Sequence, residues 1–168
     1  EQALALARKH LATDLPHLAA VTPQQLAALE AGAALSPTLA RRVRHVVEET
    51  ARVAEGRRAL ADADWAQFGR LMTASGRSSA TLYDISHPEV EALVSTANAL
   101  PGVLGARMMG GGEGGAVLVL VHRDAVASFA GGLRAGFYAE RGRADEPGLI
   151  HVCAFAPGAT LVGRARPV

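Results

Sequence analysis

Five glycines and one glutamate fill six consecutive positions between two apolar runs, and this segment is the part of the sequence that most suggests chemistry. The six positions are Gly110, Gly111, Gly112, Glu113, Gly114 and Gly115. Because glycine lacks a Cβ and is entropically costly to order, such a run needs a reason. A tight hairpin next to a bulge is one reason, and backbone amides that converge on a phosphate are another. The segment lacks a neighbouring lysine and leads into no helix, so it fits neither a P-loop nor a Rossmann fingerprint.

The other reactive side chains form no recognisable catalytic or metal-binding set. The six histidines lack the spacing of metal ligands; they are His10, His17, His45, His87, His122 and His151. Ser75, Ser78 and Ser79 have no identifiable base, which favours a polar loop over residues 75–81. His45 lies in a charged helical segment, and an ordinary helix histidine is the preferred interpretation. We therefore expect no metal site and no catalytic residue in this chain.

The segments around the glycines indicate two neighbouring strands. Val117 to Val121 is an unbroken apolar run, which predicts a strand buried on both faces. A helix is expected from Ala125 to about Glu140, with a kink or a close helix–sheet contact because of its glycines. Further strands are expected over residues 149–154 and 159–162, with Cys153 as a small buried residue. This order predicts an α+β fold of the ferredoxin-like, split βαβ type.

The first half of the chain predicts additional helices that pack against this sheet. Capping residues, prolines and apolar spacing place them at residues 3–12, 22–31, 36–62 and 65–75, and after Ser86-His87-Pro88-Glu89. Trp65 is expected to anchor the core. The chain starts at Glu1 within helix-like sequence, so we expect it to be a piece of a longer protein.

The composition narrows the classes of function. The 168 residues carry a formal net charge of +1, which gives no electrostatic footprint for nucleic acid or for an anionic membrane. No apolar run approaches the length of a membrane span, and no signal peptide is visible. A single cysteine rules out an internal disulfide and is compatible with the reducing cytoplasm, where we expect the protein to work.

Four segments together resemble the C-terminal half of the GHMP small-molecule kinases, and most closely that of the galactokinases. They are RRVRHVVEETARV at 41–53, FGRLMTAS at 68–75, YDISHPEVEALV at 83–94 and GVLGARMMGGGEGGAVLVLV at 102–121. They follow the family's order and spacing. The last segment is similar to the family's third signature motif, which is far more specific than a run of glycines.

The resemblance implies a GHMP kinase C-terminal domain over residues 1–168. It would comprise a helical lead-in over 1–35, a helical part over 36–100, and a sheet and helix with the glycine motif over 101–168. The implied protein is an ATP-dependent sugar 1-kinase that transfers the γ-phosphate of ATP, with Mg²⁺, to a monosaccharide hydroxyl. The six positions from Gly110 to Gly115 would border the nucleotide phosphates. The catalytic residues, the main ATP loop and the sugar contacts would belong to an N-terminal half that is absent from this chain.

Three departures from the galactokinase pattern leave alternatives open. Met109 stands where a threonine is usual, Glu113 where a phenylalanine is usual, and Gly76 where a histidine is usual. A carboxylate beside phosphates is repulsive unless Mg²⁺ or an arginine intervenes. The alternatives are a kinase for another sugar, such as arabinose, and a degenerate homologue that acts as a binding or regulatory module.

Overall fold

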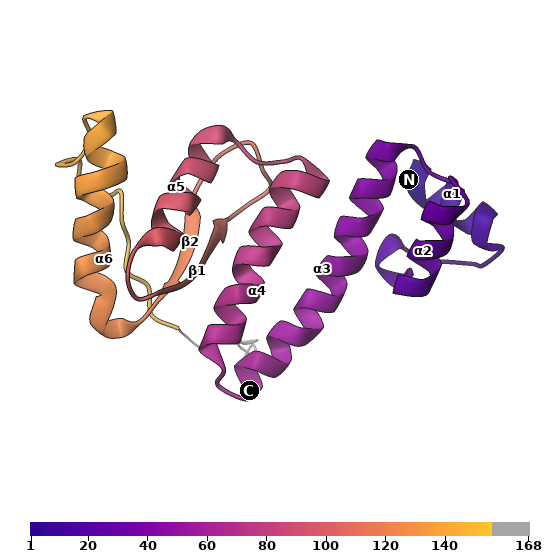
Figure 1. Cartoon of the computed structure of the whole chain (residues 1–168), viewed down its shortest axis with the longest axis horizontal. Helices are drawn as coiled ribbons and strands as arrows, with labels where there is room; N and C mark the ends of the chain where they lie inside the picture. The colour runs from indigo at the N-terminus through magenta and orange to yellow at the C-terminus, as the bar shows by residue number, and fades with distance from the viewer. Residues whose placement is uncertain (156–168) are drawn as a thin grey trace, which may run out of the picture.

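The computed structural model describes residues 1–155 as a helix-rich chain with one small antiparallel sheet (Figure 1). The helices are α1 (Gln2–Leu11), α2 (Pro23–Ala31), α3 (Pro37–Ala61), α4 (Trp65–Ser78), α5 (Pro88–Ala99) and α6 (Val126–Leu133). The strands are β1 (Val103–Met108) and β2 (Val117–Val121). The molecule is elongated, with α1 and α2 at one end and α6 at the other. The class is α+β, as the sequence predicted.

The first three helices enclose one apolar cluster at the N-terminal end. Thr22 caps α2 through a full capping box with Gln25, and Ser36 caps α3, so both starts follow the local signals in the sequence. Leu29 on α2 and Val43 on α3 are fully buried within this cluster. The cluster also contains Ala3, Ala7, Leu15, Val21, Leu26, Leu35 and Val47. This cluster joins the lead-in over residues 1–35 to the first half of α3.

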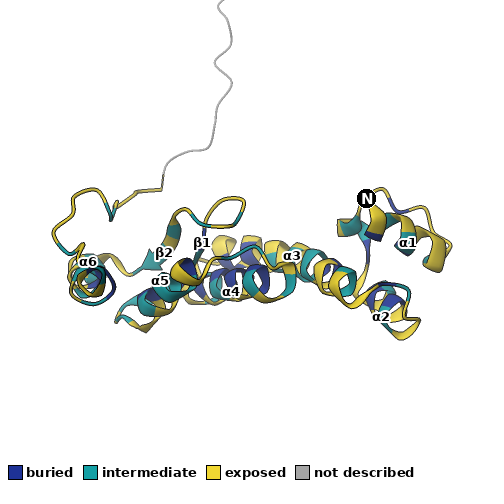
Figure 2. Ribbon diagram, turned by 90° about the horizontal axis from the view of Figure 1, so that it is seen from above, coloured by how far each residue is buried: buried dark blue, intermediate teal, exposed yellow. Residues whose placement is uncertain are grey.

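Helices α3 and α4 lie side by side and join the two ends of the molecule (Figures 1 and 2). Asp64 caps α4 by accepting a hydrogen bond from the Gln67 amide at 2.8 Å. The expected polar loop over residues 75–81 is wrong, because α4 continues to Ser78 and a π-helical turn follows over Ser79–Tyr83. Small polar residues spaced three and four apart share one face of a helix, and this face can be buried. Here Ser75, Ser78 and Ser79 are all buried.

Strands β1 and β2 form an antiparallel pair whose register runs from Val103 opposite Val121 to Met108 opposite Val117, with an irregularity near Gly105. Helix α4 crosses β1 at very short range. A Cβ at Gly69 would overlap the Leu104 carbonyl, and a Cβ at Gly105 would overlap the Gly69 carbonyl. These two glycines therefore allow the helix and the strand to meet backbone to backbone. This contact sets the position of the sheet on α4.

A second apolar cluster lies between the sheet, α5 and α6. Its buried members are Ala97, Ala106, Phe129, Leu133, Phe137 and Tyr138. The helix expected over residues 125–140 is divided, since α6 ends at Leu133 and a π-helical turn follows over Arg134–Tyr138. The predicted burial of β2 on both faces is wrong, because Leu118 is 49% exposed. An uninterrupted apolar run does not show whether other parts of the chain pack against both faces of the strand.

The segment that follows α6, and Trp65 at the start of α4, differ from the prediction. Residues 149–154 form no strand, and Cys153 is exposed. Trp65 is 41% exposed and stacks on Phe155, with 5.9 Å between the ring centroids, so it is not a core anchor. The strand expected over residues 159–162 lies outside the described residues. None of the described helices has the length and apolar character needed to cross a membrane.

Candidate functional site

The structure places all six predicted site residues in the turn that joins β1 to β2. Gly110, Gly112, Gly114 and Gly115 have φ between +98° and +138°, the left-handed region that favours glycine. A Cβ added at Gly110, Gly111 or Gly114 would meet no atom within 4 Å. One side of the turn is therefore open, and its backbone can be approached closely from outside.

The opposite side of the turn is anchored to the segment before α5. The Glu113 amide donates a hydrogen bond to the Ile85 carbonyl at 2.7 Å. A Cβ at Gly112 would lie 2.6 Å from the same carbonyl oxygen, so only glycine fits there without movement. The Met109 amide donates to the Ala116 carbonyl at 2.8 Å and closes the strand pair at the base of the turn. The turn is thus open toward solvent and fixed at its back.

The two unusual residues of the turn both face outward. Glu113 is exposed and has a φ of +60°, which is an uncommon backbone position for a residue with a side chain. Met109 is 52% exposed. An exposed carboxylate and an exposed apolar side chain therefore belong to the turn, whose backbone amides could contact an anion.

A polar network behind β1 connects three elements that are far apart in the sequence. The Ser75 hydroxyl on α4 donates to a carboxylate oxygen of Glu49 on α3, and Arg107 on β1 donates to the Ser75 hydroxyl oxygen. The Arg107 guanidinium also lies 3.7 Å from Glu49. Arg52 donates to the second carboxylate oxygen of Glu49 at 2.8 Å. We call the set Glu49, Ser75 and Arg107 the Glu49–Ser75–Arg107 bridge.

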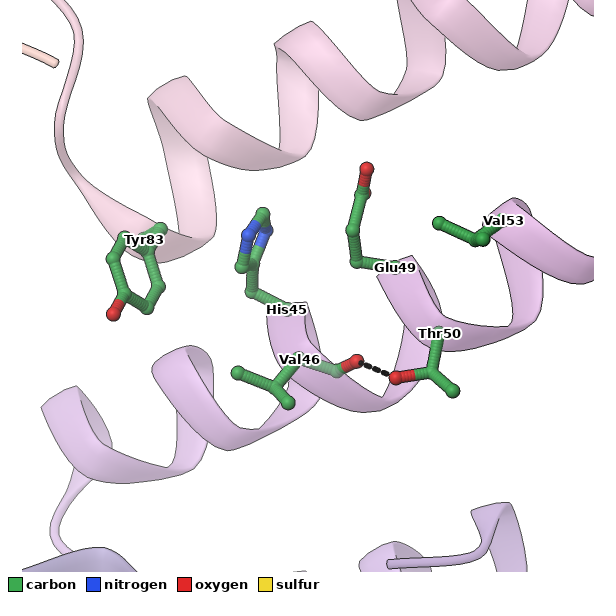
Figure 3. A pocket seen from close by; sticks show the side chains of 6 residues that line it. All are labelled: His45, Val46, Glu49, Thr50, Val53 and Tyr83. Carbon is green, nitrogen blue, oxygen red and sulfur yellow. Dashed lines mark hydrogen bonds between the residues drawn. The ribbon is translucent and has the colours of Figure 1, made fainter. Parts of the chain in front are cut away.

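A second set of polar groups lines an open hollow of about 290 Å³ beside α3. His45 Nδ1 and Ser78 Oγ share a hydrogen bond at 2.8 Å, and the ring of His45 packs on Tyr83 with 4.8 Å between centroids. Figure 3 shows His45 and Glu49 projecting from successive turns of α3 on the same side, with Tyr83 flanking His45. The residues of the glycine turn do not line this hollow.

Burial and neighbouring charge set the protonation of the two titratable groups in these sets. Burial lowers the pKa of His45 below its ordinary value of 6.5; Glu49 opposes this effect, and Arg52 and Arg107 add to it. Burial works to raise the pKa of Glu49, but hydrogen bonds from Ser75 and Arg52 and the charges of Arg52 and Arg107 outweigh it and lower that pKa. Neutral His45 and ionised Glu49 are therefore the favoured forms near pH 7.

The sequence interpretation missed the bridge. It placed Ser75 in a polar loop and gave Glu49 no role. The signal was present in the helical spacing of His45, Glu49 and Arg52, which puts all three on adjacent turns of α3. This spacing could not identify the partner side chains on α4 and β1, because those side chains reach α3 only when the elements pack together. Among residues 1–155 no group of three or more His, Cys, Asp or Glu side chains could hold a metal ion.

Comparison with known proteins identifies the class of this domain. The family model described as "GHMP kinases C terminal" matches residues 57–139, a segment that runs from the end of α3 past α6 and includes the glycine turn. Residues 57–139 of this chain therefore carry the C-terminal domain described for the GHMP kinases.

Galactokinases are among the proteins that are similar to this chain. The galactokinase of Roseiflexus sp. (strain RS-1) is 38% identical over 134 residues, which is 79% of this chain and 34% of that protein. The galactokinase of Mycobacterium tuberculosis (strain ATCC 25618 / H37Rv) is 42% identical over 142 residues, 84% of this chain and 38% of that protein. The human galactokinase is 48% identical over 85 residues, 51% of this chain and 22% of that protein.

A solved structure shares the fold. The crystal structure of Lactococcus lactis galactokinase complexed with galactose matches with a TM-score of 0.73 and 30% identity, over 82% of this chain and 35% of that chain. The chain thus spans about a third of the length of the relatives it matches. The resemblance inferred from the four sequence segments is confirmed for both the family and its galactokinase branch.

Proposed function

We propose that this chain is the C-terminal part of an ATP-dependent sugar 1-kinase of the galactokinase type. The enzyme would transfer the γ-phosphate of ATP to the anomeric hydroxyl of a monosaccharide, with galactose as the first candidate. The observation that carries the proposal is the similarity to galactokinases over four fifths of this chain. The domain would span residues 1–168, with the lead-in, helical part and glycine-motif part divided near residues 35 and 100.

The six positions from Gly110 to Gly115, Glu113 included, are proposed to border the phosphates of ATP. The open face and the positive φ angles of the turn support this role, because they let backbone amides approach a phosphate without obstruction. Phosphoryl transfer also needs a base and cationic groups around the transferred phosphate. We assign those groups, the main ATP loop and most of the Mg²⁺ binding to a preceding N-terminal half, in a protein that works in the cytoplasm.

The test is kinase turnover by the full-length protein that contains this chain. Release of ADP would be measured with Mg-ATP and a panel of aldoses, including galactose and arabinose. We expect galactose to give the highest kcat/KM. A different preferred sugar would change the substrate, and the absence of turnover with every sugar would contradict the kinase proposal.

A second candidate function is a degenerate homologue that binds ligands without catalysis. The three departures at Gly76, Met109 and Glu113 favour it, because a carboxylate at the rim of the turn opposes phosphate binding unless it is screened. Calorimetry of the full-length protein with Mg-ATP separates the two. Tight nucleotide binding together with turnover would remove this alternative.

A further inference from the structure

The glycine turn has two attachments to the rest of the molecule, and one of them runs through charged side chains. Its back is tied to Ile85 through the Glu113 amide. Its entrance is tied to α3 and α4, because Arg107 Nε donates a hydrogen bond at 3.1 Å to the carbonyl of Met108, the last residue of β1. The same guanidinium reaches Ser75 and Glu49.

We propose that Arg107 is a positioning residue: the Glu49–Ser75–Arg107 bridge holds its guanidinium on the Met108 carbonyl and thereby sets the place of the glycine turn relative to α3. The inference rests on the proposed function, in which the turn borders the phosphates of ATP. The inference gives a role to Glu49, Ser75 and Arg107, which the sequence analysis did not include among the site residues. Arg107 would not contact the reacting atoms.

The geometry favours positioning over simple stabilisation. The Arg107 side chain is 31% exposed and that of Glu49 is 27% exposed, and ion pairs with this much contact to water add little to stability. A planar guanidinium, however, can make several directed hydrogen bonds at once, which fixes the orientation of the groups it joins. Here those groups are a carbonyl at the edge of the turn, a hydroxyl on α4 and a carboxylate on α3.

Helix α4 leaves room for a side chain at position 107. A Cβ at Gly76 would lie 2.9 Å from the Cβ of Arg107, so the glycine lets β1 carry a side chain at this position close against α4. Ser75, one residue earlier, is only 4% exposed, and its hydroxyl is the central atom of the bridge. Helix α4 thus places a buried hydroxyl within reach of the guanidinium and allows β1 to lie close beside it.

The first experiment measures hydrogen–deuterium exchange in the full-length protein, in a peptide that covers residues 108–116. The Met109 and Glu113 amides are both hydrogen-bonded and report whether the turn is held. We expect Arg107→Gln to raise exchange in this peptide about tenfold, with exchange in α1 and α2 unchanged. Arg107→Lys keeps the charge but not the fork of donors, so it should restore only part of the protection.

Arg141→Gln is the matched control. Arg141 has a similar exposure of 27% and pairs with Glu89 at 2.7 Å, away from the bridge. This variant should leave exchange in residues 108–116 unchanged. If Arg107→Gln does not fold, Ser75→Ala keeps both charges and removes the central hydroxyl, and it should raise the same exchange.

The second experiment measures steady-state kinetics. For Arg107→Gln we expect KM for ATP to rise about tenfold, while kcat stays within about threefold and KM for the sugar is unchanged. Unchanged exchange in residues 108–116, or an equal rise in every peptide, would overturn the proposal. An unchanged KM for ATP in a variant with a loosened turn would also overturn the positioning proposal. In that case turnover by the wild type would still support the proposed kinase function. If the wild type turns over no sugar, the proposed function fails, whereas the exchange data still decide whether the bridge holds the turn.

Discussion

At the scale of single residues, Glu113 combines an uncommon backbone conformation with an exposed charge. Its φ of +60° is disfavoured for any residue with a Cβ, and its amide is held by Ile85. The side chain makes no hydrogen bond or ion pair with another described residue. The turn therefore depends on the backbone of this residue and not on its carboxylate.

This dependence predicts the effect of restoring the usual galactokinase residue. Glu113→Phe keeps the backbone hydrogen bond to Ile85, so turnover of the full-length enzyme should stay within about tenfold of the wild type, a barrier change of about 1.4 kcal/mol. Glu113→Gln, which removes only the charge, is the control. A loss of turnover well beyond tenfold in both variants would show that the carboxylate has an active role, whereas a loss in the phenylalanine variant alone would show that the turn does not admit the ring.

The protonation of Glu49 and His45 predicts a loss of stability in acid. The folded-state pKa of Glu49 is lowered from its ordinary 4.5, so its contribution is present above that value and is lost as the pH falls through the lowered pKa. The pKa of His45 is lowered from 6.5, so the unfolded chain takes up the proton first and stability begins to fall below about that pH. Urea unfolding between pH 7 and pH 3 should therefore show declining stability. In Glu49→Gln the decline below pH 4.5 should be smaller, and an equal decline would contradict the assignment.

At the scale of elements, the crossing of α4 over β1 decides where the glycine turn can lie. Gly69 on α4 and Gly105 on β1 meet with no side chain between them. Gly76, also on α4, makes room for the Cβ of Arg107 on β1. Helix α4 is amphipathic and its start is capped by Asp64, so its formation follows from local sequence. Its close contact with the strand follows from two glycines that are 36 positions apart in the sequence.

Gly69→Ala should therefore destabilise the protein strongly. The new Cβ would overlap the backbone carbonyl of Leu104, which cannot rotate away, and overpacking of this kind costs about 1–3 kcal/mol or more. Gly131→Ala on α6 is the control, because a Cβ there meets nothing within 4 Å and should add up to about 1 kcal/mol of stability. Free energies of unfolding from urea titrations check both. Equal effects of the two variants would contradict the close α4–β1 contact.

At the scale of the whole molecule, two separate apolar clusters are connected by the α3–α4 pair (Figure 2). The N-terminal cluster contains no residue of the sheet, and the second cluster contains no residue of α1, α2 or α3. A burial pattern of this kind lets one end loosen while the other stays ordered.

Leu29→Ala tests this separation. Leu29 is fully buried, and its truncation should cost about 2–5 kcal/mol in the N-terminal cluster. Amide exchange should rise in α1 and α2 while the β1 and β2 amides keep their protection. A uniform rise across all peptides would show instead that the described chain unfolds as one cooperative unit.

The sequence by itself determined the class of fold, the helix starts and the glycine turn between two strands. Local signals are enough for these features, because capping side chains, prolines and apolar spacing act within a few residues. It also determined the family, since the four segments keep the order and spacing of the GHMP kinases. The proposed site residues were found in the same way, because they are consecutive in the chain.

Only the tertiary structure decided which polar side chains support that turn. Glu49, Ser75 and Arg107 come from three elements, and no periodicity within one element reveals a hydrogen bond to another. The exposure of Trp65, Leu118 and Cys153 was decided in the same way, because burial depends on which surface the rest of the molecule places against a residue. Apolar character shows that a residue can be covered, and packing alone determines whether it is.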